Sequence, residues 1–383
     1  MLSDPPVGRV GIRPGHEDGG FPFLDPSRGP AEVHVVSGSF GAGHDAAARE
    51  IAIRLTEQGH LVRQWDVVDL FPARLGRLLR SAYLKQLDVS PRSWGVLLRH
   101  LEPGSPLHRM ATRALGITAR RLLSATAGAD LIVSTHPFAS QALGRLRSTG
   151  RLTTPVVTYL TDLSVHSLWV HRGVDLHLAL HEVAACQARQ WGGRATVIEP
   201  LVPYPAPGGL ADLADYRVAW GLEPASRIAL VVGGSLGIGD LAATAADVAA
   251  TGLAVPVVVC GHNEALRARL ARIPGVVALG WRTDLDALMR AADCVIQNAG
   301  GFTSLEALAT GVPVLTYRCI PGHGLTNAAA LEEAGLVPWA RDLAALGALL
   351  ARACAGAWQR PLSSQRAQTL VGALSLSSAP VPA

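Results

Sequence analysis

The sequence predicts an α/β protein made of two consecutive domains, each with a parallel β-sheet. Its 383 residues exceed the usual size of one domain. Short β-branched runs alternate with helical patterns, which is typical of βαβ units. The alternation pauses at the Pro- and Gly-rich stretch LVPYPAPGGLADL and then restarts. We therefore expect the following division: a tail at 1–30, a first domain at 31–202, a linker at 203–212, a second domain at 213–360 and a tail at 361–383.

Composition excludes several other classes of protein. Hydrophobic residues make up 49% of the chain and charged residues 17%, which predicts a large core. No apolar run reaches the roughly 20 residues that span a bilayer, and the N-terminus lacks the apolar region of a signal peptide. The five cysteines form no CxxC pair, which favours a reducing compartment. We expect a cytoplasmic protein.

The first domain opens with a strand, a Gly-rich loop and a helix. The strand is predicted at Glu32–Ser37, and apolar positions at helical spacing follow the loop GSFGAGHD until Gly59 ends the helix. His44 lies where the loop meets the helix. A neutral imidazole suits a general base near pH 7. The alternative is a loop histidine that hydrogen-bonds backbone. The next strand is predicted at Leu61–Val68.

The same loop also fits a dinucleotide fingerprint. Gly41, Gly43 and Ala46 match GxGxxA, and Asp66 follows Gly43 by 23 residues, near the position of a ribose-binding acid. This pattern predicts an NAD-dependent oxidoreductase as an alternative function. It leaves the second nucleotide-type domain unexplained.

Residues 74–121 form a basic segment. They carry ten Arg or Lys against two acidic residues, and leucines recur at helical spacing opposite the arginines. A basic amphipathic helix is typical of proteins that bind a membrane surface. The alternative is a solvated Arg face over an ordinary core stripe. Because the segment has no interleaved platform of aromatic residues, we expect no nucleic-acid binding.

The rest of the first domain supplies further strands and two candidate polar residues. Asp162 and His166 come just after the predicted strand 155–160, where ligands of parallel sheets bind. The alternative for Asp162 is that it caps a turn. The remaining strands are predicted at 130–135, 176–180 and 197–200.

The second domain repeats the pattern. Its strands are predicted at 228–232, 255–260, 276–281, 294–297 and 312–317. The glycine pairs at 233–234 and 300–301 can offer backbone NH groups at helix N-termini to a diphosphate. Asp284 and Asp286 form a DxD pattern at a helix start, for which we predict helix capping and no metal site.

Glu306 and His323 are the remaining candidates in this domain. A carboxylate such as Glu306 can accept both hydroxyl protons of a vicinal diol. The alternative is a capping box, because Thr303 precedes Glu306 by three residues. His323 is expected in a Gly-rich loop at 322–324, ahead of a helix from Asn327, and could equally be an ordinary loop histidine.

Six segments, taken together and in this order, carry a family resemblance: GSFGAGHDAAA, AYLKQLDVSPRSWGVLLRH, TDLSVHSLWVH with VDLHLAL, VVGGSLGIG, VCGHN and the stretch 293–336. Over about residues 31–350 the chain resembles GT-B glycosyltransferases of the group that contains monogalactosyldiacylglycerol synthases. It is similar, more distantly, to the GlcNAc transferase of peptidoglycan lipid synthesis. The resemblance implies two Rossmann-like domains facing a cleft, with a UDP-sugar donor held mainly by the second. It implies transfer of a hexose to a hydroxyl of a lipid or other apolar acceptor, without a metal.

The resemblance also implies roles for individual residues. It assigns catalysis to His44 and Asp162, and the acceptor side of the cleft to Gly43 and His166. The donor-binding residues that it implies are Gly234, Ser235, Gly237, Trp281, Arg282, Gly300, Gly301, Thr303, Glu306 and His323. The chain departs from the galactolipid synthases where they have a sugar-contacting Gln followed by an acidic residue, since His323 and Gly324 stand there. A nucleotide-sugar epimerase of the same fold is a further alternative. The protein is expected in the cytoplasm, peripheral on the inner face of the membrane through the basic segment.

Overall fold

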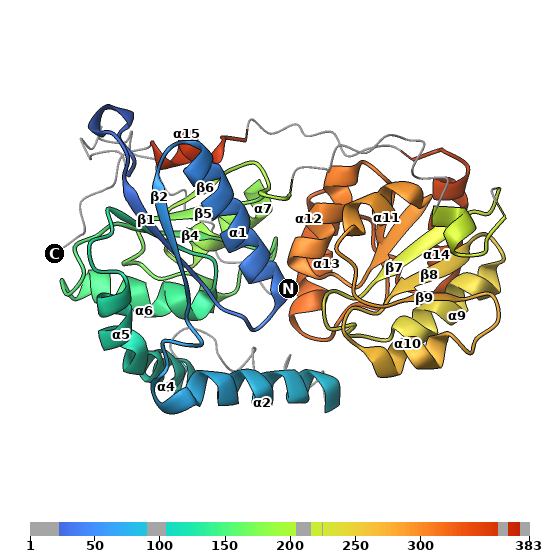
Figure 1. Ribbon diagram of the computed structural model, residues 1–383, viewed down its shortest axis with the longest axis horizontal. Coiled ribbons are helices and arrows are strands. Elements are labelled where there is room, and N and C mark those ends of the chain that lie inside the picture. Colours follow the sequence, from blue (N-terminus) through green and yellow to red (C-terminus); the bar gives the residue numbers. More distant parts are fainter. Residues whose placement is uncertain (1–22, 90–104, 204–215, 224, 359–366, 376–383) are drawn as a thin grey trace, which may run out of the picture.

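The computed structural model describes residues 23–89, 105–203, 216–223, 225–358 and 367–375. These residues form two lobes that lie side by side, each with a central parallel sheet covered by helices (Figure 1). The α/β class and the two Rossmann-like sheets predicted from the sequence are confirmed. The linker expected at 203–212 falls almost entirely outside the described residues.

The first lobe contains a six-stranded sheet in the order β2-β1-β3-β4-β5-β6. Its strands are β1 (Glu32–Ser37), β2 (Leu61–Asp66), β3 (Leu131–Ser134), β4 (Val156–Tyr159), β5 (Leu176–Ala179) and β6 (Ala195–Val197). The main helices of this lobe are α1 (Ala42–Glu57), α2 (Leu75–Val89), α4 (Pro106–Ala114), α5 (Ala119–Ala125), α6 (Pro137–Ser148) and α7 (Glu182–Gln190). The strand expected at 197–200 was placed too late, because Ile198 leaves the sheet to pair with Gln368.

The second lobe contains a five-stranded sheet in the order β11-β10-β7-β8-β9. Its strands are β7 (Ile228–Val232), β8 (Val255–Val259), β9 (Val277–Leu279), β10 (Cys294–Gln297) and β11 (Val314–Thr316). Its helices are α9 (Leu241–Thr251), α10 (Glu264–Leu270), α11 (Leu285–Ala291), α12 (Gly301–Thr310), α13 (His323–Glu333) and α14 (Leu343–Cys354). The helix expected from Asn327 begins four residues earlier, so His323 is its first residue and not a loop residue.

The strand orders place a topological switch point in each sheet. In the first sheet the connections leave β1 and β3 toward opposite sides, and in the second they leave β7 and β10 in the same way. Ligands of open parallel sheets bind at the carboxyl ends of such strands, where the diverging loops leave a crevice. His44 lies in the first turn of α1 after β1, and the turns after the other three strands hold His136, Gly234 and Gly300.

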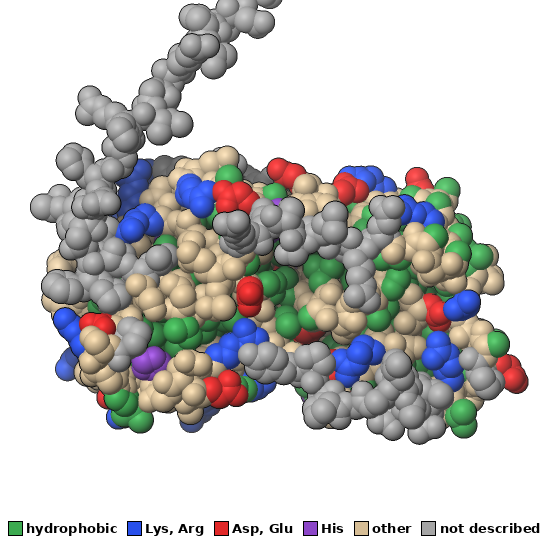
Figure 2. Space-filling view, turned by 90° about the horizontal axis from the view of Figure 1, so that it is seen from above, with side chains coloured by type: hydrophobic (Ala, Val, Ile, Leu, Met, Phe, Trp, Pro, Cys, Tyr) green, Lys and Arg blue, Asp and Glu red, His purple; other side chains and the backbone are tan. Residues whose placement is uncertain are grey.

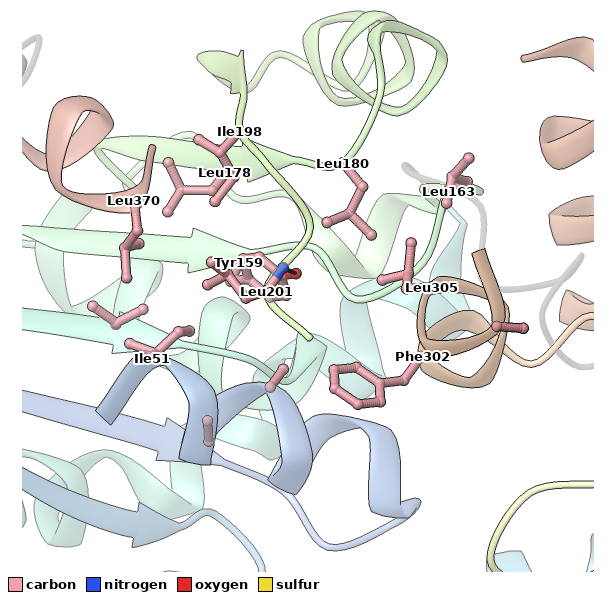
Figure 3. Close-up of a cluster of buried hydrophobic side chains, with 14 of the residues drawn as sticks. Ile51, Tyr159, Leu163, Leu178, Leu180, Ile198, Leu201, Phe302, Leu305 and Leu370 are labelled. Carbon is pink, nitrogen blue, oxygen red and sulfur yellow. Dashed lines mark hydrogen bonds between the residues drawn. The ribbon is translucent and has the colours of Figure 1, made fainter. Parts of the chain in front are cut away.

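One hydrophobic cluster runs through both lobes. Phe302 and Leu305 on α12 point toward side chains of the first lobe, including Leu163 and Leu180, and all four are buried (Figure 3). At Gly43 in α1, an added Cβ would lie 2.9 Å from the Cβ of Phe302. The two lobes are therefore in close contact through α1 and α12.

The C-terminal segment returns to the first lobe. Helix α15 (Leu370–Leu374) lies beside this lobe in Figure 1, and Leu370, Ala373 and Leu374 are buried. The backbone NH of Leu24 donates a hydrogen bond of 2.9 Å to the carbonyl of Leu374. Within the C-terminal tail expected at 361–383, residues 367–375 thus carry buried apolar side chains that complete the first core.

The described parts of the basic segment are helical, and their apolar side chains divide between core and surface. Leu115 and Ala119 are buried in the first lobe. Leu78 on α2 is 66% exposed, and Leu79, Met110 and Ile117 are exposed as well. In Figure 1, α2 extends from the first lobe toward the second. Residues 90–104 of the segment lie outside the described residues. Among the described residues, no helix is long and apolar enough to cross a bilayer.

We expect Leu374→Ala to lower the free energy of unfolding by about 2–5 kcal/mol, because it leaves a cavity in a fully buried site. Chemical denaturation of the purified protein measures this loss. Val371→Ala, on the less buried side of α15, serves as the matched control and should cost clearly less. Equal losses for the two variants would contradict the packing of α15 against the first lobe.

Candidate active site

A large cleft between the lobes collects the predicted residues. Its volume is about 1270 Å³, and both lobes line it. All residues predicted for the site line this cleft except Gly237. Gly237 has a φ of 56°, and an added Cβ would lie 2.3 Å from the carbonyl oxygen of Cys260. Gly237 therefore lets the loop after β7 pack against the end of β8, while Gly234 and Ser235 face the cleft.

His44 is held in the tautomer that a base requires. Its Nδ1 lies 2.8 Å from the carbonyl oxygen of Thr135, which can only accept, so Nδ1 carries the proton. The lone pair of the neutral imidazole is then on Nε2. Burial lowers the pKa of His44, and the nearby Asp162 charge opposes that shift. The backbone bond expected under the alternative does exist, and it leaves Nε2 basic.

Other neutral imidazoles surround His44. The ring of the buried His136 meets it edge-on, with centroids 4.6 Å apart, and burial lowers the pKa of His136 well below its ordinary value. His136 Nδ1 accepts a hydrogen bond of 3.2 Å from the backbone NH of Phe138 at the start of α6. Burial also lowers the pKa of His166 to about 4. The positive charge on this side of the cleft therefore comes from Arg49 and Arg113 and not from these two histidines.

Asp162 lies at the N-terminus of α12. An added Cβ on Gly301 would lie 2.0 Å from Oδ1 of Asp162, so the carboxylate reaches the helix of the opposite lobe. No hydrogen bond or ion pair joins Asp162 to His44 among the described residues. The Thr135 carbonyl, and not a carboxylate, orients the imidazole.

Glu306 does not take part in a capping box. Gly300 is the N-cap of α12 and Thr303 lies inside the helix, so the predicted reciprocal bonds cannot form. The Glu306 carboxyl faces the cleft, where burial, together with the charges of Asp286 and Glu50, raises its pKa to about 7. No hydrogen bond from another described residue reaches this carboxyl. It is suited to accept hydroxyl protons from a ligand.

Trp281 contributes an aromatic ring to the lining of the cleft. Its ring stacks on His262, with centroids 4.4 Å apart and an angle of 13° between the planes. Arg282 binds Asp284, which also accepts a 2.8 Å hydrogen bond from the hydroxyl of Tyr216. Asp284 is the N-cap residue of α11, as predicted, but its side chain makes no capping hydrogen bond, because these two partners take its carboxylate.

Asp286 completes the DxD pattern. It forms an ion pair of 2.8 Å with Arg290, one turn further along α11. Within the described ranges, no three His, Cys, Asp or Glu side chains are arranged to hold a metal ion.

Asn327 is the functional residue that the sequence analysis missed. Its Oδ1 accepts hydrogen bonds from the backbone NH groups of Leu163 (2.9 Å) and Ser164 (3.1 Å) in the first lobe. Its Nδ2 donates to the carbonyl of Ala299 in the second lobe at 3.0 Å. Its only sequence signal is an Asn inside an apolar helix, which does not point to a partner 163 positions away.

Asp66, the ribose-binding acid that the dinucleotide alternative requires, is engaged in other hydrogen bonds. Oδ1 of Asp66 accepts hydrogen bonds from the backbone NH groups of Val68 (2.8 Å) and Ser39 (3.3 Å), so it fastens the Gly-rich loop to β2. Asp66 does not line the cleft. Phe302 of the second lobe stands against Gly43, where a pyrophosphate would have to approach.

Two Rossmann-like domains that meet at their switch points across a deep cleft define the GT-B architecture. The comparisons agree: residues 44–201 match the family model of monogalactosyldiacylglycerol (MGDG) synthase, and residues 230–354 match that of the glycosyl transferases group 1. The chain is a glycosyltransferase of GT-B fold, homologous to diacylglycerol glycosyltransferases, as the resemblance implied.

Individual relatives agree with this class. The chain is 26% identical over 326 residues to a processive diacylglycerol beta-glucosyltransferase of Bacillus thuringiensis, with 81% of this chain and 82% of that protein covered. The fold is similar to that of Arabidopsis thaliana UGT89C1, at 12% identity, coverage of 87% and 92%, and a TM-score of 0.55. Acinetobacter baumannii MurG is similar at 18% identity, coverage of 89% and 96%, and a TM-score of 0.50. These matches give no support to the epimerase or the oxidoreductase alternative.

The raised pKa of Glu306 predicts a pH-dependent stability. The ordinary value of 4.5 becomes about 7 in the folded protein, so the folded state favours the protonated carboxyl. Its stabilising contribution is complete below about pH 4.5 and is lost as the pH rises through 7. Between pH 5 and 8, the unfolding midpoint of the wild type should therefore fall relative to that of Glu306→Gln, as calorimetry can measure. Glu57→Gln, at an exposed site on α1, is the control. If the difference in unfolding midpoint between wild type and Glu306→Gln stayed constant between pH 5 and 8, this would contradict the raised pKa of Glu306.

Proposed function

We propose that the protein transfers a hexose from a UDP-sugar to a hydroxyl group of a membrane lipid. One observation carries this proposal: a single cleft joins a basic histidine nitrogen, the N-terminus of α12 and the Gly-rich loop after β7, both suited to a diphosphate, and a long apolar wall. The named activity of the Bacillus relative, a diacylglycerol glucosyltransferase, supports the lipid as acceptor.

The donor occupies the second-lobe side of the cleft. The diphosphate lies at the N-terminus of α12, where Gly300 and Gly301 leave the backbone NH groups accessible, and against Ser235 after β7. Thr303 adds a hydroxyl donor. Glu306 accepts both ribose hydroxyls, and the uracil lies beside Trp281 and Arg282 at the same end of the cleft.

Transfer along this path needs no added metal. The carboxylates of Asp284 and Asp286, the DxD pair, already bind Arg282 and Arg290. The helix dipole of α12 and the backbone NH groups stabilise the charge that develops on the leaving diphosphate.

The acceptor occupies the first-lobe side. The hydroxyl oxygen attacks the anomeric carbon while its proton passes to Nε2 of His44. The bond between the anomeric carbon and the β-phosphate oxygen breaks, and its electron pair leaves with UDP. Apolar side chains that extend from His44 to α2 and the turn after α4 can hold acyl chains: Phe40, Phe71, Leu75, Leu79, Tyr83, Ile117 and Phe138.

The hexose lies between these sides, near His166 and His323. Gly324 has no room for the acidic side chain of the galactolipid synthases, because an added Cβ would lie 3.0 Å from the Cβ of Ile320 and 3.3 Å from the carbonyl oxygen of Asn298. His323, the first residue of α13, is therefore the side chain that we expect to select the sugar.

The acceptor side opens toward a surface that suits a membrane. Figure 2 views the molecule from above Figure 1, the side away from α2, and there too hydrophobic side chains lie among charged groups. Leu78, Met110 and Ile117 are exposed on α2, α4 and the turn that follows, and arginines flank them. We propose that these elements touch the inner face of the cytoplasmic membrane, so that a lipid can reach His44 without crossing water.

The function is tested by transfer from a panel of UDP-sugars to diacylglycerol in mixed micelles, with and without a chelator. We expect glycolipid product from at least one UDP-hexose and no effect of the chelator. His44→Ala should lower kcat by about 10²–10⁴-fold while UDP affinity, measured by calorimetry, stays unchanged. Because the pKa of His44 is lowered, the acidic limb of the wild-type kcat profile should lie below pH 6.5.

His60→Ala, which removes a histidine outside the cleft, is the control for that variant. Full transfer by His44→Ala would reject the base assignment. Release of an altered nucleotide sugar without acceptor would instead favour an epimerase.

Membrane contact is tested by sedimentation with vesicles that contain anionic lipid. Replacing both Leu78 and Ile117 by Glu should weaken vesicle binding by at least about tenfold, because two exposed apolar side chains no longer enter the lipid. Val218→Glu, at an exposed apolar site on the second lobe, should bind as the wild type does. Equal binding by the double variant would contradict the proposed surface.

A further inference from the structure

Asp162 lies between the two reacting sides of the cleft. Its carboxylate approaches Gly301 so closely that no other residue type fits there, since an added Cβ would lie 2.0 Å from Oδ1. The carbonyl of the preceding Thr161 also approaches, at 2.6 Å from the same position. A carboxylate of the first lobe thus stands at the N-terminus of α12, the end that we assign to the donor diphosphate.

The loop after β4 is held through its backbone NH groups and not through the Asp162 carboxylate. Asn327, which is only 1% exposed, accepts hydrogen bonds from the NH groups of Leu163 and Ser164 and donates one to the carbonyl of Ala299. The loop after β4 and the turn before α12 are therefore fixed to each other. Because the tie runs through buried groups, it resists exchange with water.

The Asp162 carboxylate is free to respond to a ligand. Among the described residues it forms no hydrogen bond and no ion pair. Its charge nevertheless reaches the acceptor side: burial raises the pKa of Tyr83 to about 12, and Asp162 adds to that shift. The Asp162 charge also raises the pKa of His44 against the effect of burial. The carboxylate therefore acts on both the donor side and the acceptor side.

We propose that Asp162 opposes UDP in the cleft and favours the sugar cation that forms during transfer. This inference rests on the proposed UDP-sugar donor. A diphosphate at the N-terminus of α12 brings like charge toward the carboxylate, which weakens binding of the donor and of the product UDP. Positive charge that develops at the anomeric carbon is attracted to the same carboxylate. Only the difference between the two states accelerates the reaction.

This arrangement predicts that removal of the Asp162 charge strengthens UDP binding but slows turnover. Asp162→Asn keeps the shape of the side chain and removes its charge. We expect UDP to bind this variant about tenfold more tightly, which corresponds to ~1.4 kcal/mol, while kcat falls by about 10²-fold. Calorimetry on the purified full chain measures the first quantity, and steady-state transfer from the active UDP-sugar measures the second. Asp69→Asn, which removes an exposed charge paired with Arg77 away from the cleft, should change UDP affinity by less than about twofold.

A second variant tests the role of the tie. In an Asn327→Ala background the loop is released, and the gain in UDP affinity from Asp162→Asn should shrink to less than about twofold. If Asp162→Asn raised UDP affinity equally in the wild-type and the Asn327→Ala backgrounds, the proposed role of Asn327 would be wrong. Unchanged or weaker UDP binding by Asp162→Asn, in a variant whose unfolding midpoint matches that of the wild type, would overturn the proposal for Asp162. Absence of UDP binding by the wild type would overturn the donor assignment itself.

Discussion

The close contact of α12 with the first lobe sets the geometry of the whole site. Gly43 and Gly301 are the two positions that permit it, one facing Phe302 and the other facing Asp162. Burial of Phe302 and Leu305 among side chains of the first lobe stabilises the contact. Helix α12 begins at Gly300 and Gly301, which we propose to bind the donor. The same packing therefore brings these glycines into one cleft with His44 of the first lobe.

The two sheets contribute to the cleft in the same way. Each offers the loops after two neighbouring strands that diverge at a switch point, and the contact of α1 with α12 turns these crevices toward each other. His44, the proposed base, on one side and the N-terminus of α12 on the other then face a shared space. Asn327 fixes the separation with two hydrogen bonds across the boundary and a third to Ala299 within the second lobe.

Local sequence patterns predicted most of the fold, and all but one of the predicted site residues line the cleft. Buried Val- and Ile-rich strands such as β1, β7 and β10 were placed at their observed bounds, because a continuous apolar run is a strong local signal. Contacts between distant parts of the chain were not predictable. The tie made by Asn327 and the return of α15 depend on partners far away in sequence. The start of α13 was missed because Gly322, with a φ of 89°, turns the chain directly into the helix.

The return of α15 to the first lobe makes the second lobe a continuous insertion within the first. Residues 216–358 leave the first lobe and come back to it, and 367–375 then complete the first core. The donor-binding half can therefore be exchanged between related transferases as one segment, provided that α15 stays with its own first lobe. A chimera joined at a single point would separate α15 from Leu24 and from the core that it completes. The chain's connectivity thus defines where recombination can alter donor choice and leave the acceptor half intact.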